Sequence, residues 1–144
     1  MRGMKSNNHN LPASAKWGRA ANAGFQLLPD ILLKKQNELE LSATDLIVLI
    51  NITMHWWYEG QKPFPRSQTV ATRMGIDPRT VQRSMRKMQN KGLLQRQKIT
   101  NSVGEEQTVF DLGGLVSSLS KHAVNDPGYR DRLSDKELKN ETPF

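Results

Sequence analysis

Two short helices in immediate succession are the feature that most constrains the fold of this chain. The first helix is predicted over about residues 68–74, with Ser67 as its N-terminal cap. It is predicted to end at Gly75, because glycine readily adopts the positive φ of a helix terminus. Asp77-Pro78 then predicts the cap and first residue of a second helix that runs to about Lys91. Helices joined by so short a turn cross and pack against each other.

A β-hairpin is predicted directly after these helices. Loose apolar alternation predicts strands over residues 93–99 and 107–112, and the polar stretch between them contains Gly104, as a turn does. In the helix before this unit, Asp45 lies where a capping box for Ser42 needs it. Further helices are predicted at three places: about residues 29–41, 42–58 and 115–123. The predicted fold is mainly α with a small β-hairpin wing, a winged helix-turn-helix.

The chain is predicted to have one domain with two polar ends. Residues 1–24 lack periodicity, so we expect a flexible N-terminal arm, with Trp17 and Phe25 as its candidate anchors. Residues 25–123 form the predicted winged helix-turn-helix domain. Residues 124–144 are predicted to be a polar, partly disordered C-terminal tail with a weak helix near residues 134–138. We expect the tail either to recruit a protein partner or to keep the domain in solution.

Positive charge is concentrated in the predicted helix pair and hairpin. The chain has a formal net charge of +7, yet residues 61–100 hold ten basic side chains and a single acid, Asp77. The second helix of the pair has no acid over residues 79–91, whereas a merely solvated helix usually mixes the two signs. Four of its residues lie within about 40° of the side opposite Val81. They are Arg79, Arg83, Arg86 and Asn90. This stripe favours a polyanion, most commonly nucleic acid, as the partner.

Residues 25–112 resemble the winged helix-turn-helix DNA-binding domains of bacterial transcriptional regulators and of plasmid or phage replication-initiation proteins, with residues 67–94 carrying the match. In that family the second helix of the pair enters the major groove of DNA, and the wing touches the backbone or minor groove. The resemblance implies DNA base contacts from Arg79, Thr80, Gln82 and Arg83. It implies DNA phosphate contacts from Ser67, Gln68, Thr69, Arg86, Lys87, Lys98, Asn101 and Ser102. Ser84 departs from the small apolar residue that many members have there.

Signatures of catalysis, metal binding and membrane insertion are missing from the sequence. The chain has no cysteine, its histidines (His9, His55 and His122) are far apart, and it has neither a glycine-rich phosphate loop nor a serine elbow. We therefore expect no enzyme activity, catalytic residue, metal or cofactor. The longest apolar run, residues 46–50, is far shorter than the roughly 20 residues that span a bilayer. We expect a cytoplasmic, nucleoid-associated protein and no membrane partner.

Three functions stay open at this point. The favoured one is a sequence-specific double-stranded DNA-binding protein that acts as a transcriptional regulator. The second is a plasmid or phage replication or partition factor that binds repeated DNA sites, and the sequence does not separate it from the first. The third, of another class, is a winged-helix protein-interaction subunit of a larger complex. The acid-free stripe argues against this third function as the sole role.

A homodimer is also predicted. The helix expected over residues 42–58 has a second apolar side, formed by Val48 and Ile52, beyond what one small core needs. Helix-turn-helix proteins commonly bind DNA as two-fold dimers. The alternative is that the first helix, or the arm through Trp17 or Phe25, covers this side within a monomer.

Overall fold

A helix, a sharp turn and a second helix form the upper part of the structure. The computed structural model describes residues 12–56, 62–63, 65–129 and 131. Helix α4 (Ser67–Met74) ends at Gly75, which has the left-handed φ of 69° that the sequence predicts there. Helix α5 (Pro78–Asn90) begins after Asp77, whose carboxylate accepts a hydrogen bond from the backbone N–H of Arg79. The cap predicted at Ser67 is wrong, because the residue before it is the cap and makes no side-chain hydrogen bond.

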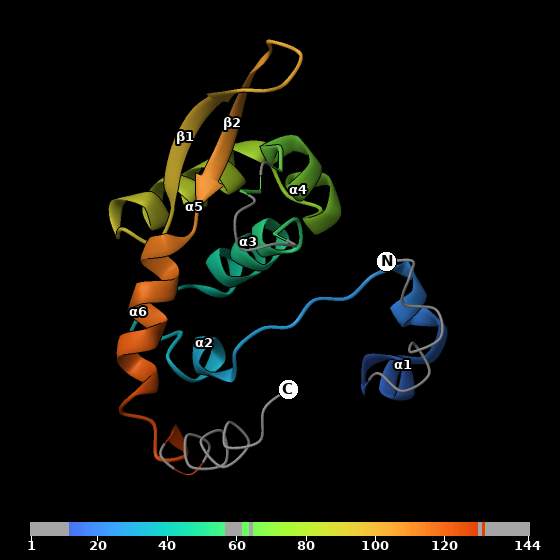
Figure 1. Cartoon of the computed structure of the whole chain (residues 1–144). Helices are drawn as coiled ribbons and strands as arrows, with labels where there is room; N and C mark the ends of the chain where they lie inside the picture. Colours follow the sequence, from blue (N-terminus) through green and yellow to red (C-terminus); the bar gives the residue numbers. More distant parts are fainter. Residues whose placement is uncertain (1–11, 57–61, 64, 130, 132–144) are drawn as a thin grey trace.

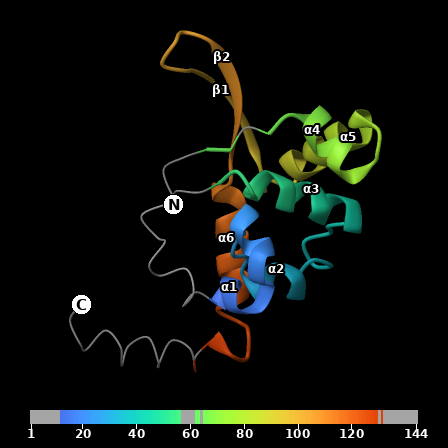
Figure 2. The same cartoon turned by 90° about the vertical axis from the view of Figure 1, so that its right-hand side faces the viewer.

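The hairpin stands beside these two helices, as Figures 1 and 2 show. Strands β1 (Gln95–Thr100) and β2 (Glu106–Asp111) pair antiparallel. The side-chain oxygen of Asn101 accepts hydrogen bonds from the backbone N–H groups of Val103 and Glu105, at 3.0 and 2.9 Å, and so closes the turn. The N–H of Phe110 donates to the carbonyl of Pro63 at 2.8 Å, which fastens the segment before α4 to β2.

Three further helices complete the domain. Helix α3 (Ala43–Thr53) starts with the predicted capping box between Ser42 and Asp45, and α6 (Gly113–Ala123) follows β2. Helix α2 (Asp30–Lys34) starts as predicted but ends early, so the prediction of a helix to residues 39–41 is wrong. Turns over residues 35–40 bring both Leu39 and Leu41 into the core, whereas a continued helix would point these two side chains to opposite sides. Helix α3 also ends before the expected residue 58, which lies outside the described residues.

Helix α3 is the centre of the hydrophobic core. In Figure 1 it lies between α4 and α5 on one side and α2 on the other. A helix between two layers must be apolar on both sides, and Val48, Leu49 and Ile52 are fully buried. The interpretation of the Val48 and Ile52 side as a dimer surface is therefore wrong, because that side is internal core.

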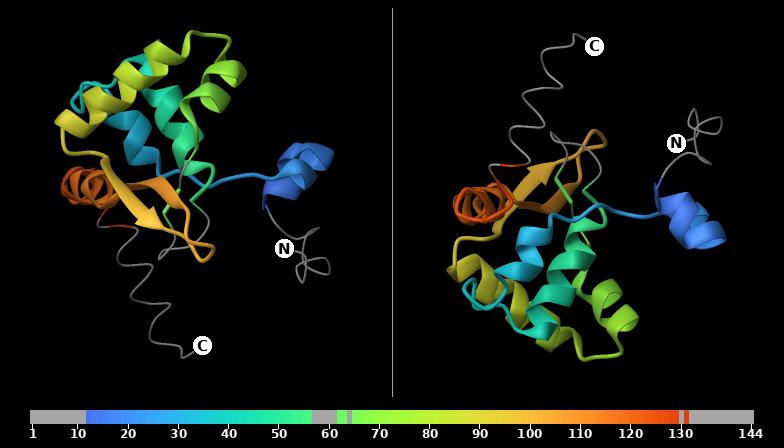
Figure 3. Two further views of the ribbon diagram at one scale, coloured as in Figure 1. Left: turned by 90° about the horizontal axis from the view of Figure 1, so that it is seen from above. Right: turned by 90° about the horizontal axis from the view of Figure 1, so that it is seen from below.

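The N-terminal arm contains helical structure. Helix α1 (Pro12–Trp17) and a 3₁₀ helix, η2 (Gly18–Ala23), pack on each other. The flexibility expected of residues 1–24 stays a prediction. Figures 1 and 3 show this unit standing away from the domain at the end of an extended link. Trp17 and Phe25 are 66% and 54% exposed, so they do not anchor it. The anchor is Gln26, whose amide bonds to the Ile50 carbonyl at 3.2 Å and to the Thr53 hydroxyl at 2.8 Å.

At the other end of the domain, the chain after α6 is tied to α2. Residues 124–128 form turns, and the Lys34 ammonium lies 3.2 Å from the Asp126 carboxylate. The weak helix expected near residues 134–138 lies outside the described residues. Among the helices of the described ranges, none is long and apolar enough to cross a membrane.

Two substitutions in α3 test its burial. Ile52→Glu should unfold the domain, because an unpaired carboxylate in the core costs several kcal/mol. Ile47→Glu is the matched control on the same helix, and it should stay folded because Ile47 is 44% exposed while Ile52 is 0% exposed. Circular dichroism melting curves measure both. An Ile52→Glu protein that melts like the wild type would contradict the central place of α3.

Candidate nucleic-acid interface

The outward side of α5 carries the predicted polar stripe. Its inward residues Val81, Met85 and Met88 are buried against the core. The stripe residues, together with Gln82, are exposed: Arg79, Gln82, Arg83, Arg86 and Asn90. Part of this side forms an open hollow of about 510 Å³ lined by Arg83, Arg86, Lys87, Asn90 and Lys91. The helix therefore presents a basic, hydrogen-bonding surface to solvent.

The predicted base-contacting residues lie together near the start of α5. Arg79 and Gln82 extend into solvent, whereas Thr80 is half-buried. The Arg83 guanidinium donates to the Thr80 hydroxyl at 3.2 Å. This bond orients Arg83, and the Thr80 hydroxyl that accepts it keeps its own O–H donor.

A buried carboxylate on α3 holds α5 in place. Asp45 accepts hydrogen bonds from the Ser84 hydroxyl at 2.7 Å, from the Lys87 ammonium at 2.5 Å and from the backbone N–H of Ser42 at 3.0 Å. Burial raises the pKa of Asp45, but these hydrogen bonds outweigh it and bring the pKa to about 2. This explains why Ser84 replaces the small apolar residue that many winged helix-turn-helix domains have there. Its hydroxyl donates to a buried acid, which an apolar side chain could not do.

Two ion pairs separate Lys87 of α5, and Lys91 just after its end, from the arginines of this helix. Lys87 is paired with Asp45, and Lys91 lies 2.5 Å from the Glu40 carboxylate. Among the described residues, Arg79, Arg83 and Arg86 have no acidic partner. The phosphate contact predicted for Lys87 remains a prediction, but its charge is balanced inside the protein. The positive charge available to a ligand is that of the arginines.

The hairpin tip is less basic than the prediction of phosphate contacts there requires. Lys98 lies 3.7 Å from the Glu106 carboxylate, with both side chains largely exposed. Asn101 uses its side-chain oxygen within the turn, as described above, and its amide nitrogen approaches the Glu105 carboxylate at 3.4 Å. Ser102 is exposed. Two acids therefore stand beside the predicted wing contacts, and they repel phosphate.

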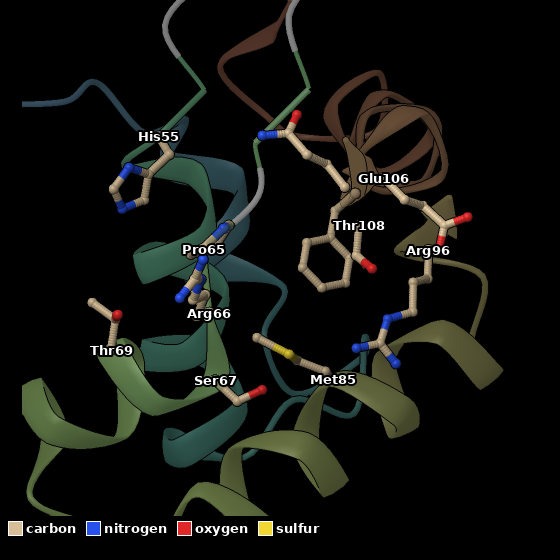
Figure 4. Close-up of a pocket in the computed structure, with 11 residues that line it drawn as sticks. His55, Pro65, Arg66, Ser67, Thr69, Met85, Arg96, Glu106 and Thr108 are labelled. Carbon is tan, nitrogen blue, oxygen red and sulfur yellow. The ribbon is translucent and has the colours of Figure 1, made fainter. Parts of the chain in front are cut away.

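The start of α4 borders a groove that the sequence analysis did not identify. This groove, about 580 Å³ in volume, separates the first turn of α4 from the hairpin (Figure 4). Ser67 and Thr69 line it, whereas Gln68 lies outside its lining and donates to the Thr72 hydroxyl at 3.4 Å. Arg66 and Arg96 also line it. Strand alternation could have placed Arg96 on one hairpin face, but only the fold brings it opposite α4.

His55 lines the same groove and has an unusual environment. Its Nε2 atom is buried without a hydrogen-bond partner among the described residues. Burial, and then the positive charge of Arg73, lower the pKa of His55, so the ring is neutral at pH 7. Within the described ranges, no group of three or more acidic or histidine side chains could hold a metal ion.

Comparison with known proteins places this fold. The profile of the DnaD N-terminal domain family matches residues 28–127. The crystal structure of the N-terminal domain of DnaD protein from Geobacillus kaustophilus HTA426 is similar with a TM-score of 0.56 and 19% identity, over 82% of this chain and 96% of that one. It confirms the mainly helical fold with a hairpin wing. A possible transcriptional regulator from Methanosarcina mazei Go1 aligns with a TM-score of 0.43 and 22% identity, over 77% of this chain and 85% of that one. No curated protein matches the sequence.

The Asp45 network predicts a pH dependence of stability. Because the folded state lowers the pKa of Asp45 from 3.8 to about 2, the stabilisation is complete above pH 4 and is lost as the pH falls toward 2. The expected contribution is about 2 kcal/mol. Urea unfolding at pH 6 and pH 2.5 measures it, and Asp45→Asn should lack this part of the pH dependence. Identical pH profiles for the wild type and Asp45→Asn would contradict the network.

Proposed function

Because the chain belongs to the DnaD N-terminal domain family, a winged-helix-like, replication-related family, we propose that it binds double-stranded DNA in a replication-related role. Helix α5 lies in the major groove in this proposal. The observation that carries it is the set of exposed arginines on α5 without acidic partners among the described residues. The family favours the replication alternative over the transcriptional regulator that the sequence analysis preferred. Such a protein works on the nucleoid, in the cytoplasm.

The geometry of α5 supports sequence-specific recognition of DNA bases. Arg79 and Gln82 extend freely from its first two turns, and Arg83 is oriented by Thr80. An arginine can bond to two acceptors of guanine, and a glutamine can bond in the same way to adenine. Arg86 lies one turn further along α5, where a backbone phosphate is the expected partner.

The arrangement of binding sites on DNA distinguishes the replication role from the regulatory role. A replication or partition factor binds tandem sites at an origin, whereas a regulator binds single sites at promoters. Footprinting of the protein on its own gene neighbourhood distinguishes these patterns. Tandem protected repeats support the replication role, and isolated promoter sites support the regulator.

A second copy of this chain is the other partner we propose, through the N-terminal arm. The extended link over residues 24–29 and helix α2 carry large apolar side chains that the rest of the chain leaves exposed. They are Phe25, Leu27, Leu28 and Leu33. Leu27 is 89% exposed, and the α1–η2 unit stands clear of the domain (Figure 3). Exposed apolar surface of this kind marks an interaction site. A homodimer formed by exchanged arms covers it and replaces the dimer surface that the core excludes.

Substitutions on α5 test the DNA proposal. Arg79→Ala and Arg83→Ala should each cost about 1–3 kcal/mol on the preferred DNA site and much less on random DNA, because each loses a base contact. Arg86→Ala is the matched comparison, since loss of a phosphate contact should weaken both DNAs equally. Competition binding with the two DNAs measures this. Equal losses for Arg79→Ala on both DNAs would mean that Arg79 contacts a phosphate and not a base. Unchanged binding for all three variants would refute the interface.

Substitution of the link tests the dimer. Leu27→Glu should keep the domain folded, because this side chain is exposed in one copy, and should weaken dimerisation at least about 100-fold if two leucines lose their burial. Val103→Glu is the control, since Val103 is 74% exposed and belongs to the turn between β1 and β2, which lies away from α1 in Figure 1. Sedimentation velocity over a range of concentrations measures both variants. A wild type that stays monomeric at high concentration, with and without DNA, would rule the dimer out.

A further inference from the structure

The groove between α4 and the hairpin has walls from two parts of the chain. One wall is the start of α4 with the residues just before it, and the other is a face of the hairpin (Figure 4). In the strand register Arg96 lies opposite Phe110, and Lys98 lies opposite Thr108, so these four side chains share that face. Met85 of α5 also lines the groove. Its volume of about 580 Å³ is well within the range of ligand-binding clefts.

Two cations face this space from opposite walls. Arg66 comes from the segment that caps α4, and Arg96 comes from β1. Both side chains are exposed, and neither has a hydrogen bond or an acidic partner among the described residues. Unlike Lys87 on α5 and Lys91 just after it, these two charges are therefore not balanced within the described part of the chain.

Further donors line the same groove. The Ser67 and Thr69 hydroxyls come from the first turn of α4, a helix without a side-chain cap, where backbone N–H groups also lack intrahelical partners. Arginine guanidinium groups, hydroxyls and helix N–H groups are together the usual partners of a phosphate oxygen.

One lining residue opposes an anion. Glu106 also lines the groove, at the first position of β2. Its carboxylate lies 3.7 Å from the Lys98 ammonium, which offsets part of its charge. The balance of the lining residues stays positive, and Glu106 gives the groove a residue whose neutralisation should strengthen anion binding.

We propose that this groove binds a backbone phosphodiester of DNA, held between Arg66 and Arg96. The inference deepens the proposed function and depends on it, since the groove lies between α4 and the hairpin, the two elements that flank α5 (Figures 1 and 4). The open groove and its exposed arginines suit a long chain of phosphates, while the half-buried Pro65 provides an apolar surface for a deoxyribose. The protein thus contacts the DNA backbone through Arg96 near the base of the wing, and of the two acids near the hairpin tip only Glu106 lines this groove.

The salt dependence of DNA binding by the full chain tests this groove. Arg66→Gln and Arg96→Gln should each weaken binding about threefold to tenfold, and each should reduce the log–log salt slope by about 0.9 on a duplex or about 0.7 on a single strand. Glu106→Gln should have the opposite sign and strengthen binding about twofold to fivefold. Lys121→Gln, an exposed charge on α6, is the matched control and should change little. Circular dichroism melting confirms that each variant is folded.

The outcomes separate this inference from the proposed function. If Arg79→Ala and Arg83→Ala impair binding while the two groove variants behave like Lys121→Gln, the groove is outside the interface and only this inference fails. If the wild type binds neither a duplex nor a single-stranded oligonucleotide, the proposed function fails as well. If Arg66→Gln and Arg96→Gln reduce the salt slope only with the single-stranded oligonucleotide, the groove is supported and unpaired DNA is the source of its phosphodiester.

Discussion

The rest of the structure depends on the hydrogen bonds that the buried carboxylate of Asp45 accepts. This carboxylate joins the first turn of α3, through the N–H of Ser42, to the middle of α5, through Ser84 and Lys87. A carboxylate without these donors would be costly to bury, so the network fixes the rotation of α5 about its own axis as well as its position. Because α5 is held at that rotation, its apolar residues face the core and its arginines face solvent.

This arrangement divides the basic residues by chemical type. Lys87 and Lys91 close ion pairs with acids of other segments, while the arginines of α5 and those of the groove have no acidic partner among the described residues. The flat guanidinium, with its fixed fork of donors, is the group suited to guanine and to phosphate, whereas a lysine acts as a simple point charge. A net charge of +7 therefore understates how directional the positive surface is.

Several signals that act over a few residues were sufficient to predict the structure, although the cap signal at Ser67 was not. Gly75 needs a left-handed conformation, Asp77-Pro78 begins a helix, and the polar stretch around Gly104 closes the hairpin. Each of these depends only on backbone preferences and on hydrogen bonds to near neighbours. The stripe on α5 follows for the same reason, because helical periodicity alone places those side chains on one side.

Contacts between distant residues were decided by the tertiary structure alone. Asp45 meets Ser84 and Lys87 across 39 and 42 positions, so no local pattern could show that a capping acid also orients another helix. Periodicity showed that α3 has two apolar sides but not that two layers of its own chain cover them. The groove of Arg66 and Arg96 likewise exists only once the hairpin folds beside α4. The sequence by itself determined the elements and the charge of their faces; their packing decided which charges are balanced, because only packing brings remote acids within reach of them.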